Sequence, residues 1–334
     1  MSRRPTSRDV AEAAGVSQST VSIVLAGKWT GRVSPHTAGV VRQAAERLGY
    51  RPNLAARNLR LGQTRTVLFV VPTLTSPFFG AVYTGAARVA AARGFGVVVY
   101  PWPDKSDDTG SPLFAGWKEM DGLLASSMVT GALADLAAAP DELPLVMLDS
   151  DPDGAAPTVN LDVAGGMRAL VSHLAEQGHR RFGHIAADVD AWTFQARGDA
   201  LGAAVAEVTG ARLVRYAAPI TVAGARAVAT TMLRAVHRPT ALLCDDDLMA
   251  AGAYKAVRDV GLDIPGDVSV TGFDDIMLAQ ALEPELTTVR LPAEALGERA
   301  MTALVEMLDG HRPRYRPLTG DLVVRGSTAP PRAT

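Results

Sequence analysis

Several features are scarce or missing in this chain, and each absence narrows its function. Only one cysteine, Cys244, occurs among 334 residues, so no intrachain disulfide can form, which fits a reducing cytoplasm. No apolar stretch follows residues 1–5, and no run of about 18 apolar residues occurs, so we expect neither a signal peptide nor a membrane span. The sequence therefore predicts a cytoplasmic protein with no membrane partner.

Positive charge is concentrated at the N-terminus. The first 60 residues contain ten Lys and Arg against three Asp and Glu, whereas the rest of the chain contains 23 against 32. A basic region joined to an acidic remainder is typical of a chain that binds a polyanion at one end and does something else at the other. The length allows two or three domains, and the apolar fraction of 48% is ample for a buried core.

Two short helices separated by a glycine are predicted in the basic region. Thr6 or Ser7 can cap the first helix, Gly15 can end it in the left-handed conformation, and Ser17 can cap the second. The second helix presents small or polar side chains outward, at Gln18, Ser19, Ser22 and Ile23. Such side chains suit the base edges of a major groove, so we expect a helix-turn-helix that docks in DNA; a small helical bundle without that role is the alternative.

Two further helices are expected before the remainder of the chain begins. Ser34 followed by Pro35 is a strong start signal for a third helix, which runs to about Leu48. Residues 53–62 read as a short helix capped by Asn53, too short to be stable alone. Its leucines and arginines have the chemistry of a minor-groove wedge, and an ordinary linker helix is the alternative.

From residue 66 onward, short apolar runs alternate with helical stretches. The apolar runs span 66–71, 96–100, 122–125, 145–148, 182–186, 241–244 and 268–273, and helical stretches include 80–93, 165–177 and 248–260. This alternation predicts parallel sheets with helices on both faces, in two sets that meet near Asn160. Two such lobes imply a ligand cleft at the carboxyl ends of the strands, where carboxylates, an arginine and aromatic rings would suit a polar ring compound.

Six motifs occur in order along the chain: residues 9–22 (DVAEAAGVSQSTVS), 48–53 (LGYRPN), 76–79 (SPFF), 178–181 (GHRR), Ala250 with Gly252, and 272–275 (GFDD). Together they resemble the lactose-repressor (LacI/GalR) family of bacterial transcription regulators over nearly the whole chain. The N-terminal motif is specific, and the others are individually weaker. The fold implied is α/β: an all-α helix-turn-helix domain and a hinge helix, then two doubly wound parallel lobes like those of periplasmic binding proteins.

The resemblance implies a homodimer on a near-palindromic double-stranded DNA operator, with Leu59 inserted at its centre. It divides the chain into a DNA-binding domain (1–52), a hinge helix (53–62) and an effector-binding domain (63–334). The lobes of that last domain cover about 63–160 with 291–320, and about 161–290 with 321–330. The predicted DNA-binding residues are Thr6, Ser7, Ser17, Gln18, Ser19, Thr20, Ser22, Ile23, Lys28, Asn53, Ala56, Arg57, Leu59 and Arg60.

The resemblance also implies a small effector in the cleft, most often a sugar, with a nucleoside or purine next. Arg197 lies where the family has an arginine that grips ligand oxygens, and Asp149 and Asp274 are placed at the same ligand. The predicted effector-binding residues are Ser76, Phe78, Phe79, Trp102, Ser126, Asp149, Trp192, Phe194, Arg197, Asp246 and Asp274. No cofactor and no metal are expected.

Some positions depart from the family pattern. Ile23 stands where the family usually has arginine, and isoleucine cannot make a bidentate contact to guanine, so the operator should differ at that base. Asp246 stands where asparagine is usual, which removes a donor and puts the usual sugar pattern in doubt. No leucine-heptad tail follows Gly326, so we expect a dimer rather than a tetramer.

Two other functions compete with a regulator. A free-standing solute-binding protein would share the two lobes but needs export, and the basic N-terminal region argues against it. In an enzyme, Asp245–Asp247 with Asp274 and Asp275 could form an acid/base or metal site, yet no glutamate or histidine is spaced to complete such a cluster. His173, His179 and His184 fall on different elements, so structural roles are expected for them.

Overall fold

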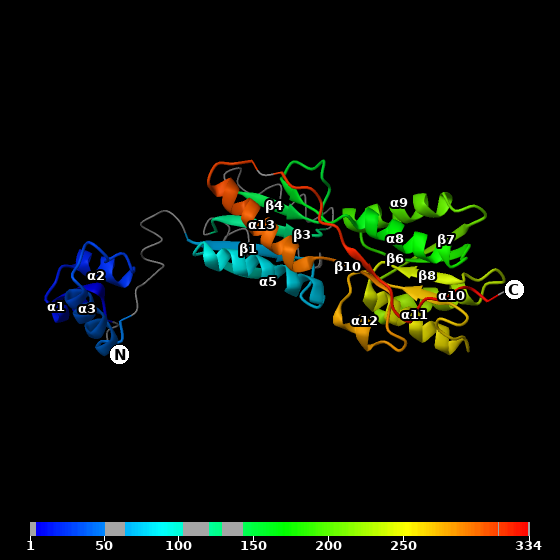
Figure 1. The fold of residues 1–334 in the computed structure, drawn as a ribbon, viewed down its shortest axis with the longest axis horizontal. Coiled ribbons are helices and arrows are strands. Elements are labelled where there is room, and N and C mark those ends of the chain that lie inside the picture. The colour runs from blue at the N-terminus through cyan, green and yellow to red at the C-terminus, as the bar shows by residue number, and fades with distance from the viewer. Residues whose placement is uncertain (1–4, 51–63, 103–119, 129–142, 313, 333–334) are drawn as a thin grey trace, which may run out of the picture. The chain divides into compact units, whose positions relative to one another are not determined.

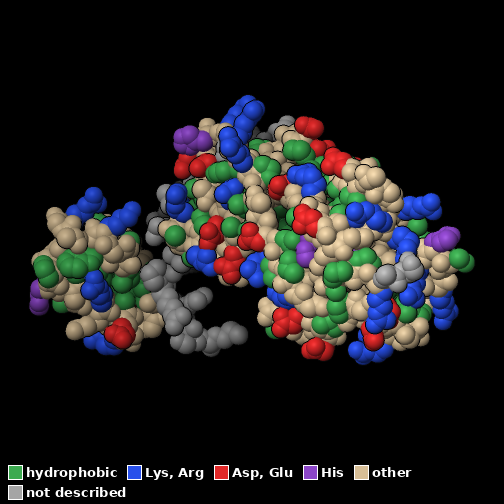
Figure 2. Space-filling model, turned by 45° about the vertical axis from the view of Figure 1, so that its right-hand side comes forward, with side chains coloured by type: hydrophobic (Ala, Val, Ile, Leu, Met, Phe, Trp, Pro, Cys, Tyr) green, Lys and Arg blue, Asp and Glu red, His purple; other side chains and the backbone are tan. Residues whose placement is uncertain are grey.

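The computed structural model describes residues 5–50, 64–102, 120–128, 143–312 and 314–332. The chain divides into two compact units, which we call the head (residues 1–64) and the body (residues 65–334). None of the helices within the described residues is long and apolar enough to cross a bilayer. Figure 2 shows acidic, basic and hydrophobic side chains interspersed over the drawn face of the body.

The head is built from three helices, α1 (Ser7–Ala14), α2 (Gln18–Leu25) and α3 (Pro35–Arg47). Thr6, rather than Ser7, caps α1, forming a reciprocal capping box with Asp9, and Gly15 ends the helix with a φ of 65°. The hydroxyl of Ser17 accepts from the backbone N–H of Thr20 at 3.1 Å and so caps α2. These caps confirm the predicted layout. The helices pack on a small core of Val10, Ala11, Val21, Val24, Ala38, Val41, Ala44 and Ala45.

The first sheet of the body is parallel, with strand order β2-β1-β3-β4-β5. Its strands are β1 (Thr66–Val71), β2 (Gly96–Pro101), β3 (Gly122–Ser126), β4 (Leu145–Leu148) and β5 (Thr158–Val159). Two helices, α5 (Pro77–Ala92) and α13 (Ala293–Leu308), lie side by side against it (Figure 1). The strands β1, β3 and β4 are almost wholly buried, which matches their nearly continuous apolar sequences.

The second sheet is also parallel, with order β7-β6-β8-β9. Its strands are β6 (Arg181–Ala187), β7 (Arg212–Ala218), β8 (Ala241–Cys244) and β9 (Ser269–Thr271), and its helices are α8 (Val163–Glu176), α9 (Trp192–Ala206), α10 (Val222–Leu233) and α11 (Asp247–Asp259). A short helix, α12 (Met277–Ala281), and an antiparallel pair, β10 (Thr288–Arg290) with β11 (Asp321–Val323), complete the body. Two parallel sheets with intervening helices confirm the predicted fold class.

Two details of the second sheet differ from the sequence prediction. The run 268–273 was expected to be one strand, but β9 ends at Thr271 because the next residue, Gly272, donates its N–H to the carbonyl of Thr287 instead. Strand β7 was not predicted at all. It is an edge strand whose side chains are mostly exposed, so it carries arginines where a buried strand would carry an apolar run.

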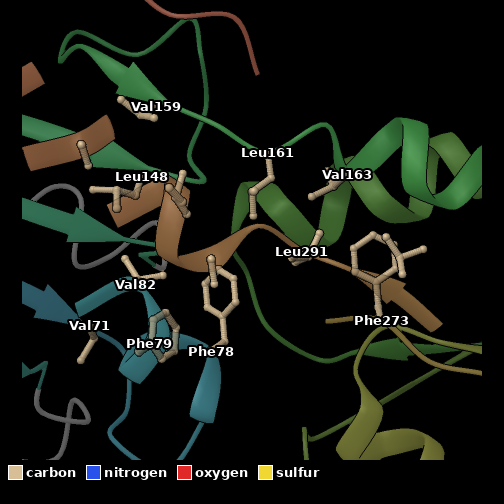
Figure 3. Close-up of a cluster of buried hydrophobic side chains, with 14 of the residues drawn as sticks. Val71, Phe78, Phe79, Val82, Leu148, Val159, Leu161, Val163, Phe273 and Leu291 are labelled. Carbon is tan, nitrogen blue, oxygen red and sulfur yellow. The ribbon is translucent and has the colours of Figure 1, made fainter. Parts of the chain in front are cut away.

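The chain crosses between the two sheets near Leu161, Leu291 and Leu318. The carbonyl of Asn160 accepts from the N–H of Leu318 at 2.8 Å, and the carbonyl of Leu318 accepts from the N–H of Asp162 at 2.8 Å. Figure 3 shows Leu161 and Leu291 among the buried side chains of this region, with the Phe78 ring of α5 and the Phe273 ring close to Leu291. A single hydrophobic cluster therefore contains residues of both sheets and of the segments that connect them.

Helices α5 and α13 approach each other more closely than side chains permit. A Cβ on Gly85 would lie 1.9 Å from the backbone oxygen of Glu294, and a Cβ on Gly297 would lie 1.9 Å from the backbone oxygen of Val82. Arg88 of α5 adds ion pairs to α13, at 2.6 Å to Glu294 and also to Glu298. Only glycine fits at these two positions, so α5 and α13 pack backbone to backbone as one layer against the first sheet.

Candidate functional site

The second helix of the head presents an uncharged polar surface. Gln18, Ser19 and Ser22 are exposed on α2, and Ile23 is half-buried. No residue of α2 is charged, so phosphate contacts at this helix would come from its backbone N–H groups, from its hydroxyl and amide side chains, or from neighbours such as the exposed Lys28. Ser17 and Thr20 are joined by a hydroxyl contact of 2.9 Å, which partly occupies both groups. Of the other predicted DNA contacts, Thr6 is exposed and Ser7 half-buried at the start of α1, whereas Asn53, Ala56, Arg57, Leu59 and Arg60 lie outside the described residues.

In the body, polar side chains gather where the parallel strands end. Ser126 ends β3, Asp149 follows β4, and Asp274 lies shortly after β9. Asp149 comes from the first sheet, yet its charge interacts with Arg197 and with Asp274 of the second. The structure therefore brings together predicted effector residues from both sheets at one place.

Backbone conformation at these strand ends is unusual. Ser127, Asp149, Asp274 and Asp275 all have positive φ, with values of 51°, 50°, 112° and 57°. Apart from Arg65, they are the only non-glycine residues with positive φ in the described part of the chain. Such conformations are disfavoured for residues with a Cβ and tend to cluster at ligand sites, where the surrounding structure holds them in place.

Arg197 occupies the centre of this group. It lies on α9 and is only 4% exposed, with its Nη2 atom 3.6 Å from Oδ1 of Asp274. Its Nη1 atom donates to the backbone carbonyl of Asp245. The guanidinium also stacks on two rings, 4.2 Å from the centroid of Phe273 and 5.2 Å from that of Phe194. These contacts fix the arginine before any ligand arrives.

Asp149 and Asp274 are held in a poorly hydrated environment. Burial raises the pKa of the Asp149 carboxyl, against the opposing effect of Arg197, and Ser127 donates its hydroxyl to Oδ2 at 3.2 Å. Burial also raises the pKa of Asp274 well above its usual range, and repulsion from Asp246, among other carboxylates, adds to this despite the attraction of Arg197. A ligand that donates hydrogen bonds would stabilise the ionised form of both carboxyl groups.

Five buried polar atoms in this region have no hydrogen-bond partner within the part of the chain that the structure describes. They are Ser126 Oγ, Asp149 Oδ1, Thr193 Oγ1, Arg197 Nε and Asp274 Oδ1, and the Thr193 hydroxyl lies close enough to Asp149 to favour the ionised form of that carboxyl. Leaving a buried donor or acceptor without a hydrogen bond costs about 1–3 kcal/mol. Such groups therefore usually have a partner in the functional state of a protein. They come from both sheets and form a buried polar cluster that a polar, hydroxylated or aminated ligand could satisfy.

The remaining predicted effector residues are less open to a ligand. Phe78 and Phe79 pack edge to face, with ring centroids 5.3 Å apart. Both are buried in the hydrophobic cluster against which α5 packs. Trp102 packs partly against the opposite face of the first sheet, beside Tyr100. Ser76 starts α5 without using its side chain as a cap, and Trp192 starts α9. Their roles in binding stay predictions.

Three residues at the cleft were not predicted as site residues. Thr193 is 1% exposed on the first turn of α9, Ser127 adjoins the predicted Ser126, and Phe273 forms the surface on which Arg197 lies. Gly166 of α8 makes room for that surface, because a Cβ there would lie 2.8 Å from the Phe273 ring. Only the tertiary fold reveals these contacts. In the sequence, the one indication that Ser127 belongs to the site is that it follows Ser126 directly at the end of β3.

The histidines and Asp245, which follows β8, serve the structure of the second sheet. His184 Nε2 lies 2.8 Å from Oδ1 of the buried Asp245. His179 and His173 instead contact the C-terminal segment, at the carbonyl of Ala329 and the hydroxyl of Thr328, each at 2.9 Å. No cluster of three potential metal ligands occurs within the residues that the structure describes. Burial raises the pKa of the Cys244 thiol.

Asp247 provides a stability test that is separate from ligand binding. It accepts from the Thr288 hydroxyl at 2.7 Å and from the Ile276 N–H at 2.8 Å, and burial raises its pKa to about 7. Because the folded state favours the protonated form, this contribution is greatest below about pH 4 and is lost as pH rises through about 7. The stability difference between the parent and Asp247→Asn should therefore shift in the variant's favour, by about 3 kcal/mol at most between pH 5 and pH 8. Urea denaturation at pH 5 and pH 8 measures it, and a pH-independent difference would contradict the assignment.

The comparisons with known proteins agree with this geometry. Residues 6–53 match the family model of bacterial regulatory proteins, lacI family, and residues 171–328 match a periplasmic binding protein-like domain. The HTH-type transcriptional repressor CytR of Escherichia coli is 32% identical to this chain, covering 97% of it and 96% of CytR. The chain belongs to the lacI family of bacterial regulatory proteins. It is thus a DNA-binding transcriptional regulator with a helix-turn-helix head.

Other relatives of the lacI family match over a similar extent. The HTH-type transcriptional repressor PurR of Aliivibrio salmonicida is 31% identical, covering 92% of this chain and 94% of PurR. A lac repressor dimer bound to operator and the anti-inducer ONPF has the same fold, with a TM-score of 0.87, 24% identity, and coverage of 98% of this chain and 100% of that one. The complex of the transcriptional regulator CelR with cellobiose has a TM-score of 0.71 and 29% identity, covering 97% of this chain and 100% of that one. A solute-binding protein with no role on DNA is not favoured.

Proposed function

We propose that this lacI-family chain is an effector-controlled repressor that binds a near-palindromic operator as a homodimer. The observation that carries the proposal is the presence, in one chain, of a capped helix-turn-helix and of a body in which five buried polar atoms from strand ends and from α9 have no hydrogen-bond partner. The first supplies a surface for base recognition, and the second supplies a binding site for a small polar molecule. Residues 53–62 would form the hinge between them.

The recognition step follows from the exposed face of α2. Gln18, Ser19 and Ser22 can hydrogen-bond to base edges in the major groove, while Lys28 and the backbone at the start of α2 contact phosphate. Phosphate contacts would make operator affinity strongly dependent on salt. Two heads on a palindrome would double the number of base contacts, which is why we propose a dimer.

The regulatory step links the cleft to the head. A ligand that pairs with Asp149 of the first sheet and with Arg197 and Asp274 of the second would favour one relative position of the two lobes. In a dimer, that shift changes the spacing of the two hinge segments, which are too short to be helical alone. A coupling free energy of about 1–3 kcal/mol would change operator affinity by about 5–150-fold.

A sugar or a related polar metabolite is the effector class that we propose. Carboxylates that accept and an arginine that donates match a ring bearing several hydroxyl groups, and two structural relatives are complexes with cellobiose and with lactose. A thermal-shift screen of sugars and nucleosides on the full chain tests this proposal, because a ligand that binds only the folded form raises its melting temperature. If no member of either class shifts the transition of the body, the proposed effector site is wrong.

Ile23 offers a direct test of the DNA-recognition surface. An arginine at this half-buried position of α2 would add a bidentate donor, so the Ile23→Arg variant should select guanine at one position of each half-site where the parent does not. The expected preference for guanine is about 1–3 kcal/mol. Selection of binding sites from random DNA measures it. Gln43→Arg, which adds the same charge at an exposed position of α3, is the control and should leave the selected base unchanged.

A further inference from the structure

The aspartates at the strand ends divide into two groups by their partners. Asp245 lies against His184 at 2.8 Å, and Asp275 is held between Arg290 at 2.8 Å and Arg325 at 2.7 Å. Asp247 is satisfied by the Thr288 hydroxyl and a backbone N–H. These three carboxylates are each engaged by a group of the protein, so a ligand is not needed to stabilise them.

Asp149, Asp246 and Asp274 form the second group: Asp149 accepts from Ser127 and Asp246 caps α11, but all three carboxyl groups interact with the same cation. Arg197 is the only basic residue that acts on all three within the part of the chain that the structure describes. One of its Nη atoms already donates to a backbone carbonyl, and the other stands 3.6 Å from Asp274. With all three carboxylates ionised, the cleft carries two more negative than positive charges. In a poorly hydrated cleft this imbalance is costly.

The unpaired atoms of the cleft show the same imbalance. Asp149 Oδ1 and Asp274 Oδ1 can only accept while ionised, and Arg197 Nε is the single obligate donor among the five. The hydroxyls of Ser126 and Thr193 can do either. The site therefore favours a ligand that has more hydrogen-bond donors than acceptors and that carries a positive rather than a negative charge.

We infer that the effector of this cleft carries a protonated amine on a hydroxylated scaffold, as in an amino sugar, and that the cleft rejects phosphorylated and carboxylated forms of that scaffold. The inference rests on the proposed function and narrows its ligand class. An amine would supply the second positive charge and up to three donors to the three carboxylates. A phosphate or carboxylate would lie beside three carboxyl groups that share a single cation, Arg197.

Asp246 is the residue through which this preference can be tested. Its Oδ1 accepts from the backbone N–H of Leu248 and caps α11, so the side chain is fixed in place. Asparagine caps helices as well as aspartate does, and Asp246→Asn therefore removes the charge while keeping the cap. Asp309→Asn, at an exposed position after α13, removes one negative charge far from the strand ends and serves as the matched control.

The experiment compares three charge forms of each of three sugars on the full chain. The probes are glucose, galactose and mannose, their 2-amino derivatives, and their 6-phosphates, with affinity measured by calorimetry at constant ionic strength. For at least one scaffold, the amino form should bind about tenfold or more tightly than the neutral form, and no phosphate should bind. Asp246→Asn should lose most of that preference, measured as the ratio of the affinity for the amino form to the affinity for the neutral form, and Asp309→Asn should keep the ratio of the parent.

The outcomes separate this inference from the proposed function. Tighter binding of a neutral sugar than of its amino form, or binding of any phosphate, would overturn the inference but leave the effector site in place. An amino preference that survives in Asp246→Asn would also overturn it, because the carboxylate would then not be its source. If no sugar in any charge form binds, and the wider thermal-shift screen is also negative, the proposed function itself fails.

Discussion

Arg197→Ala is expected to lower effector affinity by at least about 100-fold while leaving operator affinity in the absence of effector within about threefold of the parent. The arginine is buried, touches the backbone of Asp245 and Asp274's carboxylate, and keeps one N–H unpaired for a ligand. Hydrogen bonds from a charged group contribute about 1.5–3 kcal/mol each, and the loss of its positive charge leaves neighbouring carboxylates uncompensated.

Two readouts and one control variant make the Arg197 prediction specific. Calorimetry with a sugar identified by the thermal-shift screen gives effector affinity, and binding to a selected operator gives the state of the head. Arg197→Lys keeps the charge but not the planar fork or the stacking on Phe273, so it should bind more weakly than the parent and more tightly than alanine. Unchanged effector affinity in a folded Arg197→Ala protein would rule out the central role assigned to this residue.

Gly85→Ala should destabilise the body by about 3 kcal/mol or more. The added Cβ would lie 1.9 Å from the backbone oxygen of Glu294, so α5 and α13 would have to separate. Inserting atoms into a packed contact costs about 1–3 kcal/mol where side chains can move, and here the obstacle is backbone. Thermal or urea denaturation of the full chain measures the loss.

Gly80 supplies the control for this substitution within the same helix. An alanine Cβ at Gly80 meets nothing within 4 Å, and the position is exposed. Gly80→Ala should therefore leave stability unchanged or increase it by up to about 1 kcal/mol, because alanine has the higher helix propensity. Equal effects of the two substitutions would show that propensity, and not the close approach of α5 and α13, decides the outcome.

The head was predictable in detail because its signals are local. Thr6, Gly15, Ser17 and Ser34 mark helix ends through caps made within four residues of themselves, and a sequence pattern records such contacts directly. The buried strands β1, β3, β4 and β8 were predictable for a related reason. Strands covered on both faces must be apolar throughout, and that composition is visible without knowing what covers them.

Features that depend on long-range contacts were not predictable. Edge strand β7 has no apolar run, and the antiparallel pair of β10 and β11 joins segments far apart in the chain. At the cleft, the resemblance to a family pointed to Arg197, but the unpaired hydroxyl of Thr193 and the positive φ at Asp149 follow from the tertiary fold. The sequence placed several aspartates near the strand ends without showing which of them have partners.

Operator affinity measured with and without effector tests the central claim most directly. The full chain should be titrated onto an operator selected from random DNA, at fixed moderate salt, with and without a saturating sugar found by the thermal-shift screen. The account predicts a sequence-specific complex whose affinity changes by about 5–150-fold when the sugar is bound. A chain that shows no preference among DNA sequences, or an operator affinity that the bound sugar leaves unchanged, would contradict it.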